Sequence, residues 1–106
     1  MITINVARDF TRYPSGRYKS KGDTSGEAFR ERFLEEPLRE GKSLSVELDG
    51  TIGYGSSFLE EAFGGLIRSL RMTSSDLRDR LNLVTLDPIL LEEVNGYIDD
   101  AGKVLR

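Results

Sequence analysis

Two adjacent serines, Ser56 and Ser57, follow a glycine-rich turn and carry the hydroxyl groups with the clearest potential for chemistry in this sequence. The turn before them contains Gly50, Gly53 and Gly55, and glycine lets a backbone adopt positive φ or approach another group closely. Four roles are open to serines in this place: a nucleophile, part of an anion-binding turn, a phosphorylation site, or simply the cap of a helix.

A serine nucleophile lacks its usual partners here. A nucleophile elbow needs Gly-x-Ser-x-Gly and a histidine, but Phe58 stands two residues after Ser56 and the chain has no His. The chain also has no Cys, so thiolate catalysis, disulfides and thiolate metal sites are excluded, and imidazole metal sites are excluded with the histidines. We therefore expect no enzymatic activity, no metal site and no cofactor.

The other chemical roles depend on the helix that follows the turn. Glycines before a helix N-terminus offer backbone N–H groups to anions, although the Gly-x-x-x-x-Gly-Lys-Ser/Thr pattern of a P-loop is missing. Ser57 and Glu60 have the spacing of a capping box, which predicts Ser57 at the N-cap and Ser56 just outside the helix. A partner kinase could phosphorylate a serine in that place, adding about −1.5 to −2 charges.

Hydrophobic periodicity predicts the elements that hold this turn. Leu44, Val46 and Leu48 alternate with polar residues, which is typical of a strand. Residues 58–70 have apolar side chains at the i, i+4 spacing of a helix with one buried face. The turn thus lies at the carboxyl end of a strand, the usual location of sites in open α/β sheets.

The remaining elements alternate in the same way. The pattern predicts further strands at 2–6 and 81–86, a helix that Thr24 caps and Pro37 ends or breaks, a short helical turn near 74–77, and a last helix from Asp87-Pro88 to about Gly102. Alternating strands and helices predict a small α/β domain, in which helices pack against a central mixed sheet. With no linker or repeat, residues 1–106 are expected to form one domain.

A basic, aromatic segment precedes the first long helix. It carries positive charges at Arg8, Arg12, Arg17, Lys19 and Lys21, interleaved with Phe10, Tyr13 and Tyr18. Such a loop could bind a nucleotide or single-stranded nucleic acid, which gives an alternative function. The other interpretation is a solvated loop whose tyrosines cover the sheet, which the net charge of −3 favours.

Three stretches resemble a known family: Leu48 to Leu66, which contains Gly-Ser-Ser-Phe-Leu-Glu-Glu-Ala-Phe-Gly, together with residues 12–18 and 25–30. They are similar to the STAS-like domain of unknown function of bacteria and their phages, and more distantly to anti-sigma factor antagonists. The antagonists carry an Asp-Ser-Ser/Thr-Gly-Leu turn, whose first serine is phosphorylated. Ser56, Ser57 and Leu59 match that motif, whereas Gly55 replaces its Asp and Phe58 its Gly.

The resemblance implies a non-enzymatic regulatory module that binds other proteins. It makes Ser56 the candidate phosphorylation site and a histidine-kinase-like ATPase the expected partner. We expect the turn and the exposed face of the following helix to contact the partner through Gly53, Tyr54, Gly55, Ser57, Glu60, Glu61, Gly64 and Arg68. No apolar run is long enough to span a membrane and no secretory signal is present, so a cytoplasmic location is expected.

Overall fold

Three short parallel strands form the sheet of this protein. The computed structural model describes residues 1–104. Within them, β1 (Ile2–Asn5), β2 (Leu44–Glu47) and β3 (Leu81–Val84) lie in the order β1-β2-β3. The α/β class is confirmed, but both pairings are parallel, whereas we expected a mixed sheet. A helix separates each strand from the next, so the chain returns to the same end of the sheet before it pairs again.

Two long helices connect the strands and each contains one wider, π-type turn. The first runs through α1 (Gly26–Phe29), the π turn Arg30–Leu34 and α2 (Glu35–Arg39). The second runs through α3 (Ser56–Leu59), the π turn Glu60–Gly64 and α4 (Gly65–Leu70). The shorter α5 (Ser74–Arg80) precedes β3, and α6 (Pro88–Val104) follows it. Short helical turns also occur at Val6–Phe10 and Lys19–Lys21.

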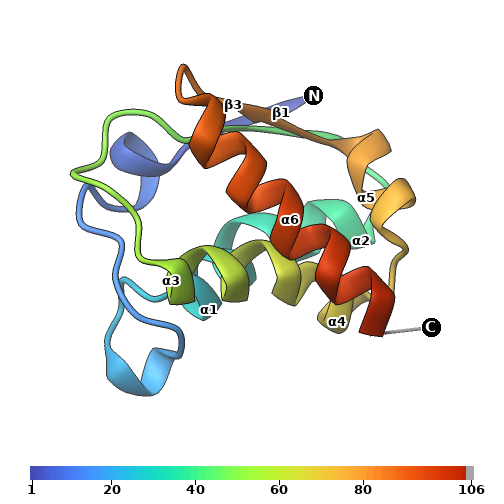
Figure 1. Ribbon diagram of the computed structural model, residues 1–106, viewed down its shortest axis with the longest axis horizontal. Helices are drawn as coiled ribbons and strands as arrows, with labels where there is room; N and C mark the ends of the chain where they lie inside the picture. The colour runs from blue at the N-terminus through green and yellow to red at the C-terminus, as the bar shows by residue number, and fades with distance from the viewer. Residues whose placement is uncertain (105–106) are drawn as a thin grey trace.

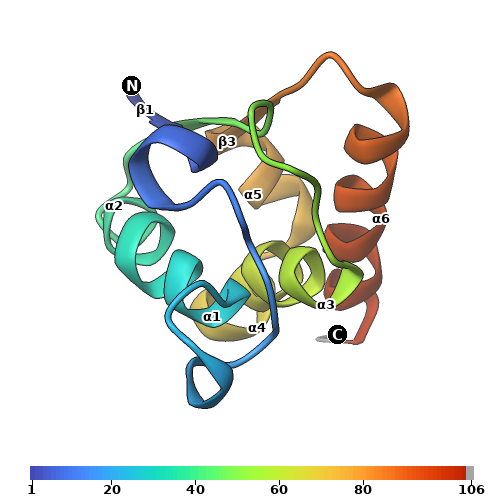
Figure 2. The same ribbon diagram turned by 90° about the vertical axis from the view of Figure 1, so that its left-hand side faces the viewer.

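The helices pack beneath one face of the sheet (Figure 1). Figure 2 shows the same arrangement from the side, with β1 and β3 at the top, α1 to α4 below and α6 at the right. The register places Leu44 between Ile2 and Leu81 on the helix-covered face, and Val46 between Ile4 and Leu83. Most of these side chains join the apolar residues of the long helices in one buried core.

The opposite face of the sheet is polar. The next positions in register are Thr3, Ser45 and Asn82, and Asn82 Nδ2 donates a hydrogen bond to Ser45 Oγ at 3.3 Å. Thr3 and Asn82 are exposed. The strict alternation of β2 thus separates an apolar face from a polar one, an arrangement more usual in antiparallel sheets than in all-parallel ones.

Helix ends differ from the predicted ones by one or a few residues. Ser25, not Thr24, caps α1, because its buried hydroxyl accepts a hydrogen bond from the amide of Ala28 at 3.1 Å. Gly55, not Ser57, is the N-cap of α3, so Ser56 is the first helical residue. Pro37 does not end its helix, which continues to Arg39. The π turn ends at Leu34 (φ −108°, ψ −40°), three residues before the proline. The hydrogen bonding of the helix is thus already irregular where Pro37 has no N–H group to donate.

Gly26 lets the two long helices cross closely. A Cβ atom at this position would lie 2.3 Å from the carbonyl oxygen of Phe58, which is backbone and cannot turn away. The first turn of α1 therefore rests directly on α3, and this contact fixes the start of the helix that carries Ser56. No helix within residues 1–104 combines the length and the apolar character needed to cross a membrane.

Candidate functional site

The turn that joins β2 to α3 is fixed at several points. Gly50 and Gly53 have φ values of 105° and 134°, which disfavour any residue with a side chain. The amide of Ile52 donates to the carbonyl of Arg12 at 2.9 Å, and Tyr54 Oη donates to the carbonyl of Leu48 at 2.6 Å. The turn is thus tied both to the end of β2 and to the basic segment that precedes α1.

Tyr54 anchors the turn through a half-buried phenol. Burial raises the pKa of Tyr54 to about 12, with a smaller contribution from the nearby Asp49 charge and an opposing hydrogen bond to Thr51. Because the folded pKa lies above the ordinary value of about 10, folding favours the neutral phenol. The stability from this group is complete below about pH 10 and is lost as the pH rises toward 12.

We therefore expect the free energy of unfolding to fall between about pH 10 and pH 12, and to fall less in Tyr54→Phe. Denaturant titrations at the two ends of this window measure the difference. Tyr54→Phe also removes the bond to Leu48, which should cost about 1 kcal/mol at neutral pH. Tyr18→Phe is the control, since Tyr18 is an exposed tyrosine. An equal alkaline loss in wild type and Tyr54→Phe would contradict this role.

Ser56 and Ser57 are both exposed at the start of the second long helix. The amide of Leu59 donates to the carbonyl of Gly55 at 3.2 Å, which is the first regular bond of that helix. The hydroxyl of Ser56 lies beside that of Tyr97, which donates to Glu93 at 2.7 Å. The bond to Glu93 raises the pKa of Tyr97, while the Ser56 hydroxyl opposes this rise. Ser56 is thus accessible to a modifying partner and has acidic neighbours.

Glu60, one turn after Ser56, holds two arginines. Arg17 Nη1 donates to Glu60 at 2.5 Å, and Arg68 donates to both oxygens of Glu60 at 2.7 and 3.0 Å. The bond from Arg68 lowers the pKa of Glu60, and that from Arg17 adds to it against the effect of partial burial. Glu60 therefore ties the basic segment to the helix that carries Ser56.

A buried arginine lies beneath this surface cluster. Arg30 donates to Glu35 at 2.7 Å and, through Nη1, to a carboxylate oxygen of Glu61 at 2.6 Å and to the carbonyl of Glu61 at 2.8 Å. The amide of Gly65 bonds to the carbonyl of Glu60, so the π turn leaves the carbonyl of Glu61 for Arg30. A Cβ atom at Gly65 would lie 2.3 Å from Arg30 Nη1, so this glycine makes room for the guanidinium.

The expected partner-contacting residues fall into two groups. Gly53, Gly55, Ser57 and Arg68 are exposed, and Tyr54 and Glu60 are partly accessible. The expectation that Glu61 and Gly64 lie on the exposed face of the helix is wrong, because both are buried. Glu61 faces Arg30, and a Cβ atom at Gly64 would lie 3.3 Å from the carbonyl of Tyr97 in α6. Their roles lie inside the fold.

Most cations of the basic segment are paired within the chain. Arg8 pairs with Asp9 at 3.0 Å, Arg17 with Glu60, and Lys19 with Glu31 at 2.5 Å. Among residues 1–104, Arg12 and Lys21 form no ion pair. Tyr13 and Tyr18 are exposed and do not cover the sheet. Anion binding by this segment stays a prediction, with little unpaired charge to support it.

Sequence reasoning missed an apolar rim around the turn. Ile52, Leu86 and Ile89 are 71%, 94% and 76% exposed. A groove of about 330 Å³ lies between the turn and the start of α6, and both Ile52 and Ile89 line it. Asp49, which also lines the groove, accepts hydrogen bonds from the Thr85 hydroxyl at 2.6 Å and from the Leu86 amide at 2.8 Å, and so holds the loop after β3 in place. These two bonds lower the pKa of Asp49. The sequence signal for this rim would have been isolated aliphatic residues within turn segments.

The described part of the chain, residues 1–104, contains no group of acidic side chains placed to hold a metal ion.

The sequence matches a family of known domains. A family described as the STAS-like domain of unknown function matches residues 25–90, which include α1, β2, the turn and both serines. No curated protein and no solved structure matches the chain.

Proposed function

Because this chain belongs to the family of STAS-like domains of unknown function, we propose that it is a non-enzymatic regulatory module that binds other proteins through the turn at 53–57. The observation that carries the proposal is the position of Ser56. It is exposed, it begins a helix of 15 residues, and it follows a parallel strand at the carboxyl edge of the sheet.

Ser56 is the phosphorylation site in this proposal, and the kinase is a histidine-kinase-like ATPase. The positive end of the helix dipole favours a phosphate at the first helical residue. Glu60 and the Glu93–Tyr97 pair lie close by and oppose it. Phosphorylation would therefore change the local charge balance and compete for the arginines that Glu60 holds, which supports a switch.

The partner interface centres on the accessible turn. Gly53, Gly55 and Ser57 offer exposed backbone and a hydroxyl group. A phosphate in the middle of such an interface adds bulk and about −1.5 to −2 charges, so an ATPase that binds the unmodified turn would be released. Because the chain has no His, Ser56 has no histidine that could act as its general base.

Intact mass spectrometry of the protein recovered from its native cells tests the switch. We expect a fraction of wild type and of Ser57→Ala to carry one phosphate group and Ser56→Ala to carry none, so that the unmodified fraction of wild type remains able to bind the ATPase. Ser57→Ala is the matched control, because the two serines are adjacent and both exposed. In pull-downs, the ATPase should be captured by wild type and Ser56→Ala and lost with Ser56→Asp. Phosphate on Ser57, or equal capture by all variants, would argue against the proposal.

A further inference from the structure

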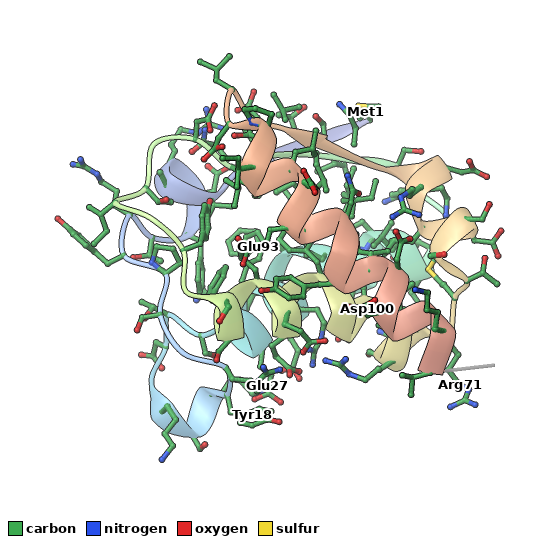
Figure 3. All side chains as sticks on the ribbon, in the orientation of Figure 1. Met1, Tyr18, Glu27, Arg71, Glu93 and Asp100 are labelled. Atoms are coloured by element: carbon green, nitrogen blue, oxygen red, sulfur yellow. The ribbon has the colours of Figure 1, made fainter. Side chains whose placement is uncertain are left out.

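The outer face of α6 carries a regular set of residues that are exposed or only partly buried. Ile89, Glu92, Glu93, Gly96 and Asp100, here called the α6 stripe, recur at intervals of three and four positions and so lie on one helix face. Val94, Ile98 and Ala101 take the opposite face and are buried. The α6 stripe lines a shallow surface hollow. Figure 3 shows Glu93 and Asp100 along the length of this helix.

The hollow continues into the groove beside the turn. Ile89 and Glu93 line both, so the two form one surface from Ile52 to Asp100. The aliphatic side chains of Ile52 and Ile89 line the groove and are 71% and 76% exposed. Leu86, whose amide donates to the groove residue Asp49, is also exposed. Clustered exposed aliphatic residues with a polar border are typical of a protein-binding surface.

The charge of this surface has one sign. Its border carries the carboxylates of Asp49, Asp87, Glu92, Glu93 and Asp100. None of the described residues that line the groove or the hollow is a lysine or an arginine. Lys103 lies 3.9 Å from Asp100 and is itself highly exposed. Such a surface attracts a cationic partner and repels the phosphates of nucleic acids and anionic lipids.

Gly96 is a second feature of this face, independent of its charge, that favours the binding of a partner. It lies in the middle of a regular helix, where glycine stabilises the helix less than alanine does. The other glycines of the helical regions, Gly26, Gly64, Gly65 and Gly102, each have neighbours that a Cβ atom would meet, whereas nothing within residues 1–104 lies within 4 Å of a Cβ atom at Gly96. No internal contact therefore requires glycine here. Because glycine has no side chain, it lets the backbone of a bound segment approach the helix closely.

We propose that the α6 stripe and its aliphatic rim bind a basic amphipathic helix of a partner protein. From Ile89 to Asp100 the helix axis rises about 16 Å, which matches about three turns of a partner helix. The partner's aliphatic residues contact Ile52 and Ile89, its lysines or arginines face the carboxylates, and its backbone crosses α6 at Gly96. This assignment rests on the proposed interaction role and adds a surface and a partner chemistry to it.

The test uses a synthetic helical peptide of about 14 leucine and lysine residues, titrated into the full chain labelled for NMR. We expect amide shift changes at residues 49–54 and 86–100, and no binding of the same peptide with glutamate in place of lysine. Gly96→Leu should weaken binding about tenfold or more by blocking the crossing point, whereas Lys103→Leu should not. Both variants add leucine to α6, and leucine favours a helix, so the fold should persist and a thermal melt checks it.

Several outcomes would overturn the assignment. These are no shift at millimolar peptide, shifts elsewhere, or equal affinity of Gly96→Leu and Lys103→Leu. A doubled mass in solution that Gly96→Leu abolishes would assign the surface to a second copy of this chain instead. The result is separable from the Ser56 switch. If the switch fails, no phosphate is found but the peptide still binds; if the docking surface fails, the peptide does not bind, whatever the mass of the protein.

Discussion

Arg30→Ala is expected to lower the free energy of unfolding by about 3–5 kcal/mol, because it leaves two carboxylates without their buried partner. The Arg30 side chain is only 8% exposed, and Glu35 and Glu61 both face it. Burial alone would raise the pKa of Glu35, but the bonds from Arg30 and Ser69 outweigh it and lower that pKa. The contribution of Glu35 is thus present above its unfolded pKa and is lost as the pH falls through the folded one.

Arg39→Ala is the matched control for this prediction. Arg39 also pairs with Glu35, at 3.4 Å, but its side chain is 59% exposed, so its loss should cost less than about 0.5 kcal/mol. Denaturant unfolding of the three proteins at neutral pH makes the comparison. In acid, the difference between wild type and Arg30→Ala should shrink as the carboxylates become protonated. A similar decrease in the free energy of unfolding in the two variants would contradict the prediction, because it would mean that the ion pairs of Arg30 are no more buried in solution than that of Arg39.

Phe58→Ala is expected to cost about 3–5 kcal/mol, because Phe58 fills the centre of the core. Its ring lies 5.8 to 6.4 Å from those of Phe10, Phe29 and Tyr54, and the side chain has no exposed surface. Phe58 occupies the position at which the antagonist motif has glycine. A side chain that holds the turn to the aromatic cluster therefore replaces an open backbone at this point.

Phe58→Leu separates shape from loss of volume and should cost less than Phe58→Ala. Thermal and denaturant unfolding measure both variants. The link to Tyr54 provides a further readout, because a collapsed ring cluster would let solvent reach Tyr54 and bring its pKa back toward the ordinary value. An unfolding free energy within about 1 kcal/mol of wild type for Phe58→Ala would mean that the cavity collapses and the core tolerates the loss.

Local periodicity was sufficient to predict the elements, but not their mutual contacts. Leu44, Val46 and Leu48 alternate because one face of β2 is buried, and burial leaves this signal in any sequence window. The pair of Arg30 and Glu61 joins positions 31 residues apart, and no local pattern encodes it. Local reasoning therefore predicts Glu61 on the exposed face, since charged residues are usually outside.

Helix ends and the binding surface were harder still. Thr24 and Ser25 are both good caps, so composition alone could not choose between them, and the closeness of Gly26 to Phe58 decides the matter in three dimensions. The aliphatic rim combines residues from two separate loops and one helix. Each of these residues is unremarkable alone, and only the folded structure brings Ile52 and Ile89 to the same groove.

The spatial order of the strands is also their order in the chain. No strand has to enter between two that are already paired, so the sheet can grow outward from β1 as the ribosome delivers each segment. The serine-bearing helix precedes β3 in this sequence of events, whereas α6 is the last described element to emerge. A nascent chain would thus present Ser56 before the acidic surface on α6 exists, and binding through that surface would report that synthesis of residues 88–104 is complete.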